Sequence, residues 1–338
     1  MSILPIFIPH AGCPHQCIFC NQRAISGQKT AALAGAKAQI ARWLTWLRPD
    51  VRHEAAFYGG SFTGLPMELQ ERLLALTDEL LRQGAIGSVR LSTRPDYIDE
   101  ERLALLKEHQ VRLVELGVQS LDDAVLQAAG RGHSAGQVYH AHALLRQFGL
   151  QTGVQLMVGL PLQDWRSVRR TAELAAELRP DVARIYPVLV VKDTPLAVQY
   201  AAGSYVPLTL EEAVAQSAYV YERLTAAGVK VIRIGLQPDE ELCAPGNIIA
   251  GPFHPSMGEL VKSRALRSQL TPQLQSLADS GVRAAELRCP ARLQSKLRGL
   301  KSCNLQYWRQ MLPQLTLKIT SCEGEEIELC PSAVPLSR

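Results

Sequence analysis

The sequence CPHQCIFC at residues 13–20 places three cysteines in one short loop, directly after the apolar segment LPIFI at residues 4–8. Thiolates are the usual ligands of iron–sulfur clusters, and soft sulfur also suits zinc. A closed structural metal site needs four ligands, whereas Cys13, Cys17 and Cys20 supply three. A cluster with three protein ligands keeps one iron free for a substrate or cofactor, so this spacing predicts a reactive metal centre.

Two other interpretations of the cysteine loop remain open. A zinc site could be completed by His10 or His15, and the cysteines could be unconnected thiols, because five further cysteines are scattered singly along the chain. The apolar segment before the loop has the pattern of a β-strand. The loop therefore stands where catalytic βα loops stand in barrel enzymes, and we favour the iron–sulfur interpretation.

Length and composition are those of an ordinary globular protein. The 338 residues can hold one large α/β domain and a smaller one. No apolar run is long enough for a membrane-spanning helix, and the N-terminus lacks a signal-peptide pattern. Eight cysteines suggest metal or catalytic use and not a disulfide framework. Because iron–sulfur chemistry needs a reducing compartment, we expect a cytoplasmic protein without a membrane partner.

Between residue 4 and about residue 230, strand-like and helix-like segments alternate. After the first strand, the expected strands cover residues 55–58, 89–91, 111–118, 154–158 and 182–188. The expected helices cover residues 34–47, 67–83, 100–109, 125–148 (with a break near Gly130) and 167–178. Such alternation predicts parallel strands with right-handed crossovers. Six units are too few to close an eightfold barrel, so we predict an α/β fold, a partial (β/α)6 TIM-like barrel, over residues 1–234. A helix at 210–227 and a strand at 229–234 would cover its edge.

The remainder, residues 235–338, is predicted to be a small basic α+β domain that follows a connector rich in proline and glycine. Residues 259–320 hold eleven basic and three acidic residues, although the whole chain has a net charge of only +4. The segment 296–320 is similar to KH domains, because a basic loop with Gly299 precedes a helix and a strand. Attraction of RNA phosphates by charge alone, or a solvated basic face, would also fit.

Glycine and polar residues stand where the second and third strands end. Paired glycines let the backbone pass close to a ligand, and here they are followed by a serine, in the order Gly59, Gly60 and Ser61. Ser92 and Arg94 are predicted to lie at the rim of the barrel, because the proline after Arg94 forces an extended approach. Arg94 could instead pair with Asp96.

The fourth and fifth strands also end in polar positions. Gln119 closes an otherwise apolar strand, where a polar side chain is costly unless it bonds to something. Arg131 follows in the sequence Gly-Arg-Gly-His, and Gln155 and Gly159 belong to the fifth strand. We treat these residues as candidates for ligand binding.

Taken together, these elements resemble the radical S-adenosylmethionine (SAM) enzymes, in the same order over residues 4–230. Their signature is C-x-x-x-C-x-x-C with an aromatic residue before the last cysteine, which is Phe19 here. The core resembles the Elongator-subunit-3-like (MiaB/NifB-type) group. The pattern G-V-Q-S followed by G-R-x-H is also similar to oxygen-independent coproporphyrinogen oxidases.

This resemblance implies a [4Fe–4S] cluster held by Cys13, Cys17 and Cys20, with SAM bound at the free iron. It further implies a SAM-binding site made of Phe19, Gly59, Gly60, Ser61, Ser92, Gln119, Arg131, Gln155 and Gly159. Gln119 would contact the ribose, and Arg131 the methionyl carboxylate. Three positions depart from the family pattern, because Ser61 and Ser92 replace acids and Gln155 replaces an aspartate.

The implied activity is reductive cleavage of SAM to start radical chemistry, with a flavodoxin or ferredoxin as electron donor. The basic C-terminal segment favours RNA or tRNA as the substrate. A small-molecule or porphyrin-type substrate is the second interpretation. A non-enzymatic iron–sulfur protein that binds RNA is the third.

Overall fold

The computed structural model describes residues 2–8, 10–13, 17–21, 32–46, 48, 50–237 and 242–332. Two sequence-based expectations fall on other residues. His15, the alternative zinc ligand, and Leu47, the predicted end of the first helix, lie outside the described part of the chain.

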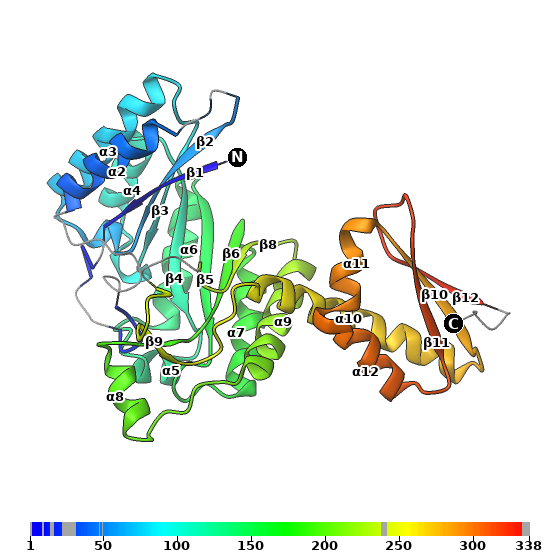
Figure 1. Ribbon diagram of the computed structural model, residues 1–338. Coiled ribbons are helices and arrows are strands. Elements are labelled where there is room, and N and C mark those ends of the chain that lie inside the picture. Colours follow the sequence, from blue (N-terminus) through cyan, green and yellow to red (C-terminus); the bar gives the residue numbers. More distant parts are fainter. Residues whose placement is uncertain are drawn as a thin grey trace.

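One sheet of seven parallel strands forms the body of the molecule, in the order β1-β2-β3-β4-β5-β6-β8. The strands are β1 (Ser2–Phe7), β2 (His53–Tyr58), β3 (Val89–Thr93), β4 (Val111–Gln119), β5 (Gln151–Val158), β6 (Val182–Pro187) and β8 (Lys230–Ile234). The sheet curls into a half-barrel (Figure 1). This confirms the predicted partial (β/α)6 TIM-like barrel, and the strand expected at residues 229–234 joins the sheet edge as β8.

Helices follow most strands and cover the outer face of the sheet (Figure 1). They are α2 (Ala32–Leu44), α3 (Met67–Arg82), α4 (Glu100–Glu108), α6 (Ala135–Gln147), α7 (Trp165–Leu178) and α9 (Leu210–Ala226). The short helices α5 (Asp123–Ala128) and α8 (Pro195–Ala201) lie instead at the end of the sheet, where they pack with Ile18 and Phe19 (Figure 1). The helical stretch expected at 125–148 is broken as predicted, because Gly130 and Gly132 have positive φ and Ser134 caps α6 with a capping box. None of the described helices is both long and apolar enough to cross a membrane.

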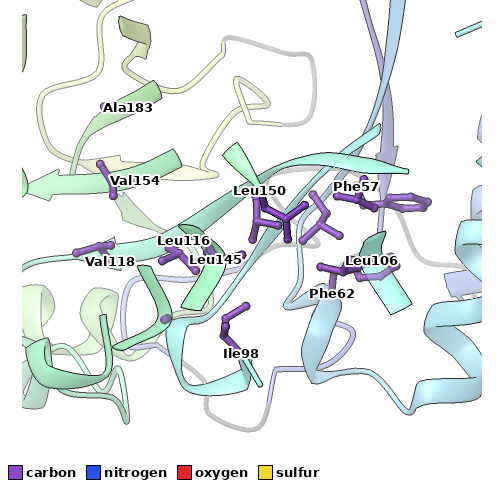
Figure 2. Packing of buried hydrophobic residues seen from close by; sticks show 14 of the residues in the cluster. Phe57, Phe62, Ile98, Leu106, Leu116, Val118, Leu145, Leu150, Val154 and Ala183 are labelled. Carbon is purple, nitrogen blue, oxygen red and sulfur yellow. The ribbon is translucent and has the colours of Figure 1, made fainter. Parts of the chain in front are cut away.

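The main core lies between the sheet and these helices. Alternate strand residues point to opposite faces of a sheet, and the outward set is mainly apolar. Phe57, Leu116 and Val154 belong to this set and are almost fully buried, together with Leu145 of α6 (Figure 2). The helices are therefore held on the sheet by apolar burial, the dominant favourable contribution to folding.

The opposite, inner face of the half-barrel is polar. Glu115 on β4 is only 1% exposed, and its Oε1 accepts a hydrogen bond from Arg184 Nη2 on β6 at 2.9 Å. Arg90 on β3 donates from Nε to Glu54 Oε2 on β2 at 2.6 Å, and its Nη1 lies 3.6 Å from Glu115 Oε1. Two acids and two arginines thus form one buried network across four strands, in which each charge has a partner of opposite sign.

The C-terminal part has its own three-stranded sheet and core. Its elements are α10 (Met257–Asp279), β10 (Ala284–Cys289), α11 (Ala291–Arg298), α12 (Cys303–Met311), β11 (Thr316–Ser321) and β12 (Glu328–Ser332). β10 lies in the centre, parallel to β11 and antiparallel to β12. Trp308 is fully buried there, and its Nε1 donates to Thr271 Oγ1 at 2.9 Å.

The long helix α10 connects the two parts of the molecule (Figure 1). Its N-terminal residues Met257 and Val261 pack with Ala218 of α9, whereas its C-terminal half belongs to the second core. Before α10, β9 (Ile248–Ala250) pairs with β7 (Val190–Val191) of the barrel. The chain thus returns to the barrel after residue 235, and the domain boundary at that residue stays a prediction.

We predict that Glu115→Gln lowers the free energy of unfolding by about 3–5 kcal/mol, because it leaves Arg184 buried without a carboxylate partner. Thermal and urea denaturation would measure the loss. The double variant Glu115→Gln/Arg184→Met should be less destabilised than Glu115→Gln alone, since it removes the uncompensated charge. A single variant as stable as the parent would show that Arg184 does not need Glu115 as its partner.

Candidate functional site

A pocket lies at the carboxyl ends of the first five strands, beside the cysteine loop. Its lining consists of His10, Cys13, Cys17, Phe19, Cys20, Gly59, Gly60, Ser92, Thr93, Arg94, Gly117, Gln119, Arg131 and Gln155. Every predicted site residue lines it except Ser61 and Gly159, and the assigned roles stay predictions.

The cysteine loop is held by direct backbone contact with the loop after β2. Ser61 N donates to Ala11 O at 2.9 Å, and His10 N donates to Gly59 O at 3.1 Å. Gly12 has a φ of 71°, and a Cβ atom added to it would lie 2.1 Å from Ser61 O. A residue with a side chain at position 12 would therefore separate the two loops.

The three cysteines enter the pocket from this loop. Cys17 is buried, and Arg131 Nη1 donates to its Sγ at 3.0 Å. The pKa of the Cys13 thiol is raised, because its surroundings desolvate the thiolate and Cys17 lies nearby, while the charges of Arg94 and Arg131 act in the opposite direction. The pocket thus combines thiols with two guanidinium groups.

The spacing of the sulfur atoms differs from that of a single-ion site. Within the described parts of the chain, no three His, Cys, Asp or Glu side chains lie close enough together to hold one metal ion. An iron–sulfur cluster binds each thiolate at a different iron, so its ligands are spaced more widely than those of one ion.

Two arginines bring unused hydrogen-bond donors to the pocket. Arg94 pairs with Asp96 through two bonds of 2.9 and 2.8 Å, which confirms the pairing considered from the sequence. Arg94 nevertheless lines the pocket, and its Nη1 is buried without a partner among the described residues. The Nε of Arg131 is also buried without a hydrogen-bond partner among the described residues. Buried donors are costly to leave unpaired, so a bound anion such as a carboxylate fits this position.

His133 is buried close to these arginines, and neither ring nitrogen has a hydrogen-bond partner among the described residues. Burial lowers the pKa of His133 to about 3, and the charges of Arg131 and Arg94 add to the effect. The imidazole is therefore neutral at neutral pH and adds no further positive charge beside the guanidinium groups.

Neutral hydrogen-bonding groups lie on the neighbouring strands. Gln155 Nε2 donates to Ser92 Oγ at 3.0 Å, which links β5 to β3. Gln119 has a left-handed φ of 64° at the end of β4, where the register between β4 and β5 shifts. Such backbone strain is concentrated at functional sites. Gly117 leaves the space that the side chains of Gln119 and Arg131 occupy.

Two predicted site residues point elsewhere. Ser61 is fully buried, and its Oγ lies 3.0 Å from Thr93 Oγ1, so it ties the loop after β2 to β3. The carbonyl of Gly159 accepts a bond from the Tyr205 hydroxyl at 2.7 Å. Four further residues line the pocket without having been predicted as part of the cofactor site, namely His10, Thr93, Arg94 and Gly117. Apart from His10, each of them stands within two residues of a predicted site residue.

The residues of the pocket fit a [4Fe–4S] cluster with SAM. Three thiols are available as cluster ligands, and Arg94 and Arg131 have donors that no group among the described residues satisfies. Gln119 and Gln155 add neutral hydrogen-bonding groups of the kind that contact ribose hydroxyls.

The chain is similar to several known proteins. It is 30% identical over 213 residues to an uncharacterized protein of Methanocaldococcus jannaschii, covering 60% of this chain and 65% of that protein. It is 25% identical over 260 residues to the tRNA uridine(34) acetyltransferase of Methanocaldococcus infernus, covering 65% of this chain and 49% of that protein. The chain thus spans between about half and two thirds of the length of these relatives.

A solved structure shares the fold. The archaeal Elp3 of Methanocaldococcus infernus, with an N-terminal deletion, superposes with a TM-score of 0.61 at 21% sequence identity, covering 83% of this chain and 68% of that one. Two family models also match. The model of the Radical SAM C-terminal domain matches residues 180–267, and the model of the Radical SAM superfamily matches residues 7–175, which is half of the chain. The chain therefore belongs to the Radical SAM superfamily.

Proposed function

We propose that this radical SAM enzyme acts on RNA, with a [4Fe–4S] cluster bound by Cys13, Cys17 and Cys20 and SAM bound beside it. Members of the superfamily are enzymes that use this cluster and SAM. The bound cluster supplies the electron that cleaves SAM reductively. The protein's own contribution is to bind, orient and shield the reacting groups.

The observation that carries the cofactor assignment is the pair of buried guanidinium donors next to the cysteines. Arg94 Nη1 and Arg131 Nε have no partner among the residues described, and a carboxylate between them would satisfy both. We assign the methionyl carboxylate of SAM to this position. Ser92, Gln119 and Gln155 are assigned to the ribose, and the backbone of Gly59 and Gly60 to the amino group.

The observation that favours RNA is a loop in the C-terminal part, residues 298–302, which we name the basic loop. It joins α11 to α12. In the sequence these two helices come after β10 and before β11, and the two strands pair in parallel. This strand–helix–loop–helix–strand order is similar to KH domains, whose loop clamps a nucleic-acid backbone. Arg298 and Lys301 are exposed on it. One relative is named a tRNA uridine(34) acetyltransferase, which supports the same substrate class.

Hydrogen bonds from α12 hold the two helices that flank the basic loop. The buried Asn304 donates to Ser263 O and Leu297 O, each at 3.1 Å. Lys301 and Ser302 both have left-handed backbones, with φ values of 51° and 61°. A loop that is already ordered loses less entropy when it binds, so this anchoring favours recognition of a backbone.

The porphyrin interpretation has less support. The sequence motifs that the chain shares with coproporphyrinogen oxidases are the segments around Gln119 and Arg131. Both segments reach the pocket that we assign to SAM. These two motifs therefore concern the cofactor, whereas a coproporphyrinogen-III oxidase-like relative of Bacillus subtilis, 26% identical over 196 residues, keeps a porphyrin-type substrate as the second candidate. A flavodoxin or ferredoxin as electron donor and a cytoplasmic location stay predictions.

We predict that Cys17→Ala abolishes iron–sulfur absorbance after anaerobic reconstitution. Arg131→Leu should retain iron but weaken SAM binding about tenfold to a hundredfold, because it removes a charge-assisted hydrogen bond. Iron content, SAM binding and release of 5′-deoxyadenosine would be measured for each variant. Arg112→Leu, at an exposed position of β4, is the matched control. Undiminished SAM binding by Arg131→Leu would exclude its assignment to the carboxylate.

We predict that Arg298→Glu/Lys301→Glu weakens binding of bulk tRNA and reduces the slope of log affinity against log salt by about 2, since two phosphate contacts are lost. Filter binding at several salt concentrations would measure both. Lys107→Glu/Lys230→Glu changes the net charge equally at exposed positions of the barrel and should have little effect. Equal losses in the two double variants would mean that the basic loop is not a specific contact.

A further inference from the structure

Two tyrosine hydroxyls on the inner face of the half-barrel are held by one buried arginine. Arg184 Nη2 donates to the Tyr58 hydroxyl at 2.7 Å, and its Nη1 donates to the Tyr186 hydroxyl at 3.4 Å. The charge of Arg184 is neutralised by Glu115, which accepts two hydrogen bonds from it. Both hydroxyl oxygens are therefore fixed in position by a group that is itself fixed.

Each hydroxyl still has its own proton to donate. Among the residues described, Tyr58 and Tyr186 donate that proton to no protein acceptor, and both side chains are partly exposed. Burial of the hydroxyl raises the pKa of Tyr58 to about 12 and also raises the pKa of Tyr186. Both groups are therefore neutral hydrogen-bond donors at neutral pH.

These donors lie next to the cofactor pocket. Tyr58 directly precedes Gly59 of the pocket lining. Tyr186 is two residues after Arg184 on the same face of β6, and Arg184 is paired in register with Gln155, which lines the pocket from β5. A molecule that contacts both hydroxyls would thus be adjacent to SAM.

The charges on the inner face limit what can bind there. Glu54 pairs with Arg90, and Glu115 pairs with Arg184, so the buried network has no net charge. A substrate with several carboxylates would meet no unpaired cation in this network. Buried charge without a partner is costly, so the inner face suits an uncharged polar group.

At the open edge of the half-barrel lies a cation without an acidic partner among the described residues. Arg233 belongs to the edge strand β8, next to Arg184 in register, and donates to the side chain of Gln237 at 2.7 Å. It has no carboxylate partner within the described part of the chain. Its charge acts on Tyr186, so it is near the two hydroxyls.

We propose that this inner face binds a single RNA base, with the hydroxyls of Tyr58 and Tyr186 donating to carbonyl acceptors on the ring, and Arg233 pairing with the phosphate of the same nucleotide. This inference rests on the proposed RNA substrate and names the group that is presented to SAM. A base offers acceptors and no charge, whereas its phosphate carries the one negative charge that Arg233 can bind. The site would reject a ring without carbonyl acceptors. Such a ring would displace water from both hydroxyls and offer them no hydrogen-bond acceptor in its place.

The test uses the reconstituted full-length enzyme and measures release of 5′-deoxyadenosine with and without bulk tRNA. For Tyr58→Phe/Tyr186→Phe, the fold-stimulation by tRNA should fall about tenfold, because two hydrogen bonds are lost. Arg233→Gln should raise the tRNA concentration needed for half-maximal stimulation. Tyr200→Phe, a partly exposed position on α8, is the control and should behave as the parent.

The outcomes separate this inference from the proposed function. If tRNA does not stimulate the parent enzyme, the RNA assignment fails and the inference fails with it. If tRNA stimulates the parent and the double tyrosine variant equally, the inference alone is overturned. It is also overturned if the variant loses release without tRNA to the same degree, because the hydroxyls would then serve SAM. The single variants repeat the comparison if the double variant does not fold.

Discussion

The site depends on the close backbone contact between the cysteine loop and the loop after β2. Gly12 lies where any side chain would collide with Ser61 O, and Ser61 N in turn donates to Ala11 O. A segment with few apolar residues is thereby fixed to the rigid end of the sheet. Because Ser61 also contacts Thr93 on β3, three consecutive βα units determine where the cysteines stand. A metal centre on a loop needs this kind of support from the scaffold.

The sheet separates two kinds of chemistry on its two faces. Its outer face buries apolar side chains under the helices, whereas its inner face carries the network of Glu54, Arg90, Glu115 and Arg184. Buried ion pairs add little stability compared with apolar residues of the same size. The network instead positions side chains, since Arg184 donates hydrogen bonds to two tyrosine hydroxyls.

The C-terminal part forms a second structural unit. It has a separate core around Trp308, and it is joined to the barrel by the continuous helix α10. Asn304, just after the basic loop, donates hydrogen bonds to α10 and to α11. Because α10 also packs on the barrel, these bonds connect the basic loop to the barrel. A surface for a polyanion and a neutral inner face for one uncharged group are compatible with a single long substrate.

The sequence by itself determined the cysteine spacing, the alternation of strands and helices, and the glycines at the ends of strands, because these depend on neighbouring residues and on periods of two and 3.6. It therefore predicted the half-barrel and most of the pocket lining. Only the tertiary structure decided that Ser61 turns toward Thr93 and that Arg184 pairs with Glu115. It also decided that Arg94, while paired with Asp96, keeps a donor that no described residue accepts. Such contacts join residues up to 69 positions apart. They follow from strand order and sheet curvature, and neither can be predicted from neighbouring residues alone.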